Sequence, residues 1–245
     1  MTDQLDKTDD VFIWKDISIL QKEDVFKVGT DALLLGAWVP RILSNTNSIL
    51  DLGSGTGILA LIMHRAFPDA SILAIDRDEN SVALCSHNFS KAIQPNLLTA
   101  SLQDLFSFRP SALFDLIVCN PPYFFNPHHQ HQGPYSRARH AEEEPTMWMK
   151  KMATFLRANG NVCLVLPEGI APLWIKAGND SGLYVARRLN VYSFTSDNVP
   201  KRVLLHFTTT LISPLLEQMC IYTEYDQYSE EYKKMMAGDE VSSLT

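Results

Sequence analysis

The sequence predicts an α/β fold built on a doubly wound, mainly parallel sheet with helices on both faces. One observation is the alternation of short apolar runs with longer amphipathic stretches between about residues 46 and 211. A second is that the runs at 114–119 and 161–166 are almost wholly apolar, as strands buried on both faces are. The third is a glycine-rich turn at 51–57, DLGSGTG, which joins the first run to a helical stretch.

Composition indicates one sizeable domain, since the chain has 245 residues and 46% of them are hydrophobic. The formal net charge is -7, so nucleic-acid binding would have to use a local basic patch. The four cysteines form no C-x-x-C pair, which favours reduced, buried thiols. No secretory leader is evident, and no apolar run reaches the roughly 18 residues of a membrane span. We therefore expect a cytoplasmic protein without membrane or metal contacts.

The first part of the chain is expected to be an extension before the sheet. Residues 1–10 are polar and acidic, and 11–21 mix apolar and polar residues as short strands do. Residues 30–39 predict a helix, with Thr30 and Asp31 as its N-cap pair and Pro40 at its end.

The sheet and its helices are expected between residues 46 and 211. The predicted strands are 48–52, 71–76, 97–100, 114–119, 161–166, 183–194 and 203–211. The predicted helices are 57–67, 78–91, 142–156 and 168–179. The longest irregular stretch is 124–139, and long loops in compact domains tend to be functional or disordered.

The glycine turn predicts a ligand site at the end of the first strand. Gly53, Gly55 and Gly57 allow a tight turn and a close approach of the backbone to a ligand. Their spacing is neither the G-x-G-x-x-G of dinucleotide enzymes nor a P-loop, which disfavours phosphate binding. Asp51, just before the glycines, would repel a pyrophosphate but suits a ligand that carries a cationic ammonium or sulfonium group.

Two more acids follow the second and third strands and favour a nucleoside ligand. Asp76 can accept hydrogen bonds from both ribose hydroxyls, and Asp104 can accept one from an adenine amino group. Either acid alone could instead be a solvated turn residue or a helix cap, and for Asp104 alone that is the favoured interpretation. The three acids in order, each at a strand end, favour binding.

The tetrapeptide Asn120-Pro121-Pro122-Tyr123 directly follows the fourth strand and predicts chemistry on a planar amino nitrogen. Such a nitrogen is a poor nucleophile, because its lone pair is delocalised. The amide oxygen of Asn120 and the backbone carbonyl of Pro121 can accept its two N–H bonds and free the lone pair. The prolines stiffen the turn, and Tyr123 offers a face on which an extruded base can stack. A proline-rich turn without function is the competing interpretation.

These residues resemble the class I methyltransferases that methylate amino groups. The block FKVGTDALLLGAW at 26–38 resembles the N-terminal signature of bacterial tRNA (adenine-N6)-methyltransferases that modify the adenosine beside the anticodon of valine tRNA. Segments 137–140, 200–205 and 228–232 resemble further motifs of that family. The resemblance spans residues 12–232, and its most specific part is the block at 27–38.

The resemblance implies a Rossmann-like methyltransferase sheet of seven strands, with the last strand antiparallel. It implies S-adenosyl-L-methionine as methyl donor, S-adenosyl-L-homocysteine as product and tRNA as partner. Lys27, Thr30 and Asp31 would line the methionine end of the cofactor site. The rest would be held by Asp51, Gly53, Gly55, Gly57, Asp76, Asp104 and Asn120. We expect one domain over 1–245, with an extension at 1–45, a core at 46–232 and, unlike the family, a polar tail at 233–245.

The loop after the tetrapeptide is a small cationic and aromatic island in an acidic protein. Arg137, Arg139 and His140 lie where an RNA backbone would pass. The competing interpretation is a flexible solvated loop, and a histidine-bound metal is disfavoured because no acid stands at ligand spacing.

Other substrates share the tetrapeptide chemistry. They are a protein glutamine amide, guanine N2 in ribosomal RNA and adenine N6 in DNA. The block at 27–38 and the lack of room for a DNA-recognition domain argue against them. A non-catalytic cofactor-binding or RNA-binding module is the alternative from another class, and the intact tetrapeptide argues against it.

Overall fold

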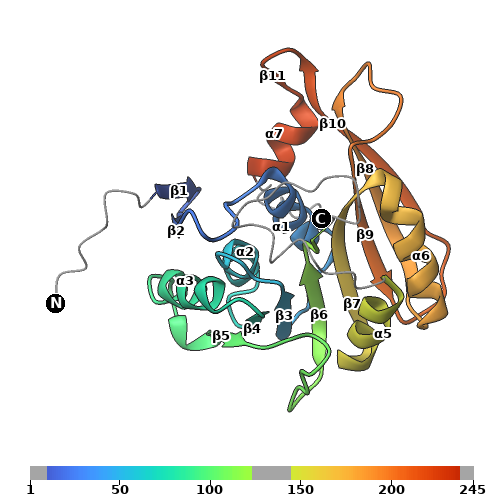
Figure 1. The fold of residues 1–245 in the computed structure, drawn as a ribbon. Helices are drawn as coiled ribbons and strands as arrows, with labels where there is room; N and C mark the ends of the chain where they lie inside the picture. The colour runs from blue at the N-terminus through green and yellow to red at the C-terminus, as the bar shows by residue number, and fades with distance from the viewer. Residues whose placement is uncertain (1–9, 123–144, 238–245) are drawn as a thin grey trace, which may run out of the picture.

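The computed structural model describes residues 10–122 and 145–237, and its central feature is one nine-stranded sheet (Figure 1). Its strands are β3 (Ser48–Leu52), β4 (Ser71–Asp76), β5 (Leu98–Leu102), β6 (Phe114–Cys119), β7 (Leu156–Pro167), β8 (Tyr184–Phe194), β9 (Arg202–Thr208), β10 (Leu215–Glu224) and β11 (Gln227–Tyr228). Their spatial order is β11-β10-β8-β9-β7-β6-β3-β4-β5.

Seven of these strands confirm the predicted doubly wound sheet. β5, β4, β3, β6 and β7 are parallel neighbours, and β9 lies antiparallel between β7 and β8. The expected antiparallel last strand is therefore β9. β10 pairs in parallel with β8 and β11 closes the edge, so the sheet is two strands wider than predicted. Much of β10 is exposed, and Glu217 and Gln218 interrupt its apolar residues, so its sequence does not have the pattern of a strand buried on both faces.

Helices cover both faces of the sheet, as predicted (Figure 1). They are α1 (Thr30–Ile42), α2 (Ile58–Ala66), α3 (Glu79–Phe89), α5 (Pro145–Phe155), α6 (Ala171–Asp180) and α7 (Glu230–Ala237). Helices α1, α2, α3 and α7 contribute to one apolar core, and α5 and α6 contribute to the other. In β3 the side chain of Ile49 enters the first core and that of Leu50 the second, as strand alternation requires. Within the described ranges, no helix combines the length and apolar character that a membrane crossing needs.

Three local predictions are wrong. Helix α1 continues past Pro40 to Ile42, where the N–H of the following Leu43 donates to the Val39 carbonyl at 3.1 Å and closes the last turn. Its N-cap is Gly29 and makes no side-chain cap bond, so Thr30 and Asp31 lie inside the first turn. The polar tail cannot begin at 233, because α7 runs to Ala237 and buries Met235 against the core.

A β-hairpin precedes the sheet and is tied to the glycine turn. It consists of β1 (Asp10–Trp14) and β2 (Ile17–Gln21). The Asn88 amide of α3 accepts a hydrogen bond from the Leu20 N–H and donates one to the Thr56 carbonyl, at 2.9 Å each. The hairpin, helix α3 and the turn at 53–57 are therefore held as one unit.

Candidate functional site

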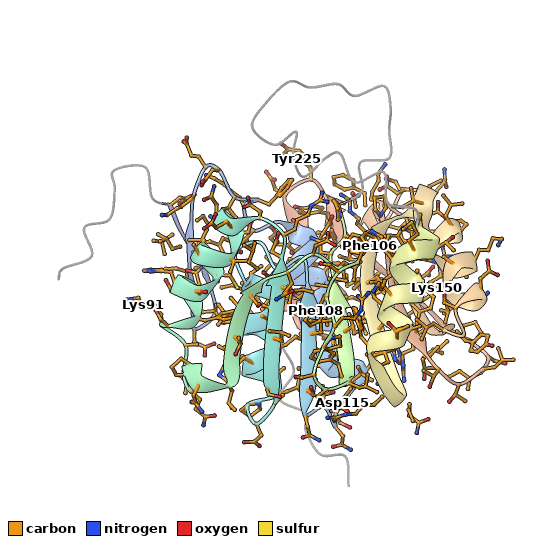
Figure 2. The ribbon with its side chains drawn as sticks, turned by 60° about the horizontal axis from the view of Figure 1, so that its bottom comes forward. Lys91, Phe106, Phe108, Asp115, Lys150 and Tyr225 are labelled. Atoms are coloured by element: carbon orange, nitrogen blue, oxygen red, sulfur yellow. The ribbon has the colours of Figure 1, made fainter. Side chains whose placement is uncertain are left out.

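The predicted site residues gather at the carboxyl edge of the sheet. Leu52 of β3 is in register with Ile75 of β4 and with Cys119 of β6. Gly53, Asp76 and Asn120 each follow one residue later, so they emerge side by side from three neighbouring strands. In Figure 2, Asp115 at the amino end of β6 and Tyr225 beyond β10 lie toward opposite ends of the strands.

The glycine turn adopts the left-handed backbone that its sequence predicts. Gly53, Gly55 and Gly57 have φ angles of 77°, 50° and 83°. A Cβ added to Gly53 or Gly55 would meet nothing within 4 Å, so the space beside them is open to a ligand. A Cβ on Gly57 would lie 2.7 Å from the sulfur of Cys85. Two of the glycines therefore leave room for a ligand, and the third is required for packing.

Asp51 is buried at the end of β3, where it accepts a hydrogen bond of 3.0 Å from the Ala60 N–H of α2. Burial raises the pKa of this carboxyl to about 7, the Ala60 bond opposes the shift, and the charge of Asp76 adds to it. A carboxylate with this pKa gains from a cation placed beside it.

Asp76 braces the glycine turn from the neighbouring strand. One carboxylate oxygen accepts the Gly55 N–H and the other accepts the Asp78 N–H, each at 3.0 Å. Burial raises its pKa, and both backbone bonds oppose that shift. The turn is further held by the Gly53 and Ser54 N–H groups, which donate to the Ile75 carbonyl.

Asp104 caps the turn after β5. Its Oδ1 atom accepts the Phe106 and Ser107 N–H groups at 2.9 and 3.1 Å. This is the cap that the competing interpretation predicts for the residue. The preceding Gln103 N–H donates to the Asp76 carbonyl, which places Asp104 next to the end of β4.

Part of the tetrapeptide follows β6 as predicted. Asn120 and Pro122 are partly exposed and Pro121 is buried. Tyr123, Arg137, Arg139 and His140 lie outside the described residues, and their roles stay predictions.

The N-terminal block reaches the same edge through an ion pair that sequence reasoning missed. Asp31 in α1 pairs with Arg202, the first residue of β9, at 2.8 Å. Since Arg202 is in register with Pro167 at the carboxyl end of β7, the first turn of α1 is held at the carboxyl edge. Thr30 lies in that turn, and Lys27 forms an exposed pair with Asp10 at 3.4 Å. The one signal in the sequence was that Asp31 and Arg202 both lie in segments that resemble the family, at 26–38 and 200–205.

Comparisons with known proteins agree with this architecture. The methyltransferase small domain family matches residues 20–169. A tRNA1(Val) (adenine(37)-N6)-methyltransferase of Bacteroides thetaiotaomicron is 32% identical over 226 residues, 91% of this chain and 94% of that protein. One of the same name from Vibrio parahaemolyticus is 32% identical over 225 residues, 91% and 92% of the two chains.

Solved structures agree on the fold. A crystal structure described as a predicted O-methyltransferase from Agrobacterium tumefaciens superposes with a TM-score of 0.64 at 14% identity, covering 85% of this chain and 96% of that one. The fold, the extent of the family match and the identity over nine-tenths of the chain lead to one conclusion. This chain belongs to the methyltransferase small domain family, within the group of the tRNA1(Val) (adenine(37)-N6)-methyltransferases.

Proposed function

We propose that this protein transfers a methyl group from S-adenosyl-L-methionine to N6 of an adenosine in tRNA, beside the anticodon of valine tRNA, in the cytoplasm. The observation that carries the proposal is the placement of Asn120 next to Gly53. Both follow the register pair Leu52–Cys119, so the amino-group acceptor adjoins the open glycine turn. The choice of adenine as the base and of tRNA as the substrate rests on the names of the relatives.

The residues at the strand ends fit the proposed methyl donor. Gly53 and Gly55 leave open space where a nucleoside can lie against the backbone. Asp51 favours a cation nearby, and Asp76 lies where a ribose would meet the end of β4. Gly57, Asp104, Lys27, Thr30 and Asp31 are proposed to complete the site. When bound, S-adenosyl-L-methionine supplies an electrophilic methyl group on a sulfonium.

Asn120 is proposed as the catalytic residue that activates the amino nitrogen. Its side-chain oxygen accepts one N–H of the adenine amino group, and the Pro121 carbonyl accepts the other. This draws the nitrogen out of conjugation and directs its lone pair toward the methyl group. The prolines fix these acceptors in advance, so catalysis is mainly positioning and electrostatics. No strong general base is needed, because the methylated nitrogen becomes acidic and releases its proton.

The test is a substrate survey with labelled methyl donor. Pools of tRNA, ribosomal RNA, DNA and protein are incubated with the enzyme, and the modified residue is identified by mass spectrometry. N6-methyladenosine in valine tRNA is the expected product. Methylation of glutamine, of guanine N2 or of DNA adenine would replace the proposed substrate with one of the alternatives.

The catalytic role is tested by Asn120→Ala, which should lower kcat by at least ~100-fold and change cofactor affinity by less than about twofold. Asn96→Ala is the matched control, because Asn96 is an exposed asparagine just before β5 at the amino edge. An equal loss of cofactor affinity in the Asn120 variant would assign the residue to cofactor binding instead.

A further inference from the structure

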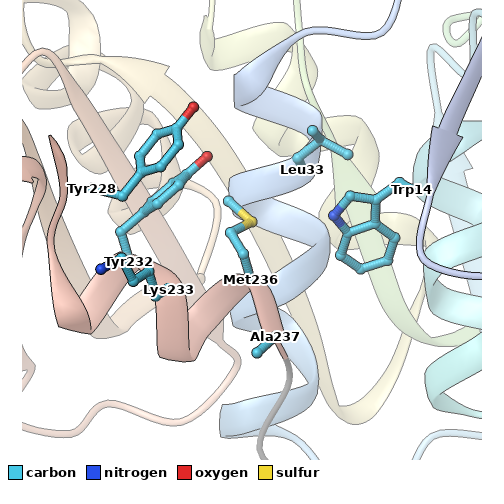
Figure 3. A pocket seen from close by; sticks show the side chains of 7 residues that line it. All are labelled: Trp14, Leu33, Tyr228, Tyr232, Lys233, Met236 and Ala237. Carbon is cyan, nitrogen blue, oxygen red and sulfur yellow. The ribbon is translucent and has the colours of Figure 1, made fainter. Parts of the chain in front are cut away.

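An aromatic groove lies beside Leu33 in the first turn of α1, and none of its lining residues is among those proposed to bind the cofactor (Figure 3). It is a shallow surface hollow of about 420 Å³ that is widely open to solvent. Its lining includes Trp14 of β1, Leu33 of α1, Tyr228 of β11, and Tyr232, Lys233 and Met236 of α7. Figure 3 shows Trp14 facing Met236 across the hollow, with Leu33 of α1 above them in this view.

A ladder of stacked rings leads into this groove. Phe194 and Tyr222 have ring centroids 5.4 Å apart, Tyr222 and Tyr228 are at 5.0 Å, and Tyr228 and Tyr232 are at 4.9 Å. The interplanar angles are 29°, 21° and 23°, so the rings are nearly parallel. Tyr228 is 47% exposed, but Tyr222 and Tyr232 cover its two ring faces, so its exposed part is the ring edge. The aromatic surface of the groove that is open to a planar ligand is that of Trp14, which is partly exposed on the facing wall.

The ladder lies at the same edge of the sheet as Asn120. β8 runs parallel to β6, because β9 is antiparallel to both β7 and β8. β10 is parallel to β8, so the ends of both strands, at Phe194 and Glu224, are carboxyl ends. From β6 these strands are three and four positions along the sheet, roughly 15–20 Å at ordinary strand spacing. A polymer with its target base at Asn120 can reach the groove with a neighbouring part.

The walls of the groove carry cations. The Lys15 ammonium lies 4.5 Å from the centroid of the Trp14 ring, and Lys233 lines the opposite wall. Lys233 pairs with Glu230 at the surface, a weak interaction that a phosphate can displace. Glu224 at the end of β10 and Asp226 on the β10–β11 connection repel phosphate, which favours a path of the RNA backbone along the two lysines.

We propose that this groove stacks a second base of the substrate RNA, one that flanks the adenine to be methylated. The inference rests on the proposed function for the substrate being RNA. Single-stranded nucleic acid commonly binds to aromatic side chains flanked by cations. Every base offers a π face for stacking, and every phosphodiester linkage carries a negative charge. The groove thus positions the RNA and does not contact the reacting atoms.

Tryptophan fluorescence tests the contact directly. Of the four tryptophans, Trp38, Trp148 and Trp174 are buried and Trp14 is partly exposed. A valine tRNA transcript should quench the emission of the wild-type protein, and Trp14→Phe should lose that quenching. Quenching that persists undiminished in Trp14→Phe, or no quenching of the wild type at saturating transcript, would overturn the inference.

Steady-state kinetics test the positioning role. Tyr228→Leu removes an inner ring of the ladder that lines the groove, so it should raise KM for the transcript about tenfold, with kcat and KM for the methyl donor unchanged. Tyr225→Leu is the matched control, because Tyr225 is 83% exposed three residues away and does not line the groove. A KM within twofold of wild type in a folded Tyr228→Leu protein would overturn the inference.

The two proposals fail separately. A transcript that quenches Trp14 but is not methylated would refute the proposed function and support the groove as an RNA site. A transcript that is methylated without quenching Trp14 would support the proposed function and refute the groove as an RNA site. If Tyr228→Leu changes the elution volume in size-exclusion chromatography and leaves KM for RNA unchanged, a second copy occupies the groove and the inference is wrong.

Discussion

The Nε atom of Arg202 lies 2.8 Å from each carboxylate oxygen of Asp31, although the two residues are 171 positions apart. The pair joins the first turn of α1 to the first residue of β9, the strand that reverses direction in the sheet. Asp31 is the less exposed partner, at 19% against 36% for Arg202. This contact holds the N-terminal block at the carboxyl edge, beside the strand ends proposed to bind the cofactor.

Arg202→Gln should therefore destabilise the protein and weaken cofactor binding. Losing this partly buried pair should cost about 1 kcal/mol, or a fall in Tm of roughly 2–4 °C at this chain length. Arg187→Gln is the matched control, because Arg187 is also 36% exposed and its oxygen partner on Glu217 lies 3.9 Å away. Thermal unfolding and calorimetry with S-adenosyl-L-homocysteine measure both effects. Equal losses in the two variants would show that the Asp31 contact has no special role.

The glycine turn predicts that two alanine substitutions affect stability and cofactor binding to different extents. Gly57→Ala adds left-handed strain and a Cβ at 2.7 Å from Cys85, so it should lower the free energy of unfolding by about 2 kcal/mol or more. Gly53→Ala adds strain without a clash, so it should cost about 1 kcal/mol. Its new methyl group enters the open space, and cofactor affinity should fall at least tenfold.

Urea unfolding and calorimetry separate these two effects. If Gly53→Ala binds the cofactor with wild-type affinity, the open space beside Gly53 is not the cofactor site. If Gly57→Ala is as stable as wild type, the neighbouring Cys85 can move aside.

Much of the fold was predictable because the central strands are buried on both faces. β6 is apolar except for Asp115 and β3 except for Ser48 and Asp51, and the glycine and proline residues that follow them mark the carboxyl edge. The edge of the sheet gave no such signal, since Leu215, Leu216 and Tyr228 are exposed and Glu217 and Gln218 interrupt the apolar residues of β10. Helix α7 was missed for the same reason, because it buries Met235 alone among charged neighbours.

The placement of candidate site residues was predictable where the residue type itself indicates a local conformation or position. The glycines of the turn have positive φ, and Asn120 follows its strand. Asp104 was ambiguous because an acid after a strand caps a turn as readily as it binds a ligand, and the structure shows the cap. The Asp31–Arg202 pair and the aromatic groove join segments far apart in the chain. Contacts between such distant segments depend on the order of the strands in the sheet, and local sequence patterns do not determine that order.

Asp51→Asn should stabilise the free protein at neutral and alkaline pH. Burial raises the pKa of Asp51 to about 7, so between pH 4 and 7 the folded state binds more protons than the unfolded state. The contribution of the Asp51 carboxyl to the free energy of unfolding is therefore fully present below about pH 4 and is lost as the pH rises through about 7. Asparagine does not titrate and can still accept the Ala60 N–H. The Tm of the variant should exceed that of wild type by at least about 2–4 °C at pH 8, with a smaller gap at pH 5.

The control for this experiment is Asp69→Asn, an exposed aspartate before β4. A gap for Asp51→Asn that is constant with pH would show that its carboxyl has an ordinary pKa. The same variant should bind S-adenosyl-L-methionine more weakly than wild type at pH 8, where the wild-type carboxylate is charged.

His206 should make the protein sensitive to mild acid. It is buried on β9, and its Nε2–H donates to the Asn161 side-chain oxygen at 2.7 Å. Burial and, to a lesser extent, the charge of Arg187 lower its pKa to about 4, whereas an unfolded histidine titrates near 6.5. Between these values the unfolded state binds more protons, so this contribution to stability is full above pH 6.5 and is lost as pH falls toward 4.

His206→Gln keeps a donor for Asn161 but does not titrate in this window. Its free energy of unfolding should therefore fall less than that of wild type between pH 7 and 4.5, by about 2 kcal/mol. Denaturant unfolding at the two pH values measures the difference. His87→Gln on α3 is the control, because that ring reaches solvent and the variant should follow wild type. A His206 variant with the acid sensitivity of wild type would place the titrating group elsewhere in the chain.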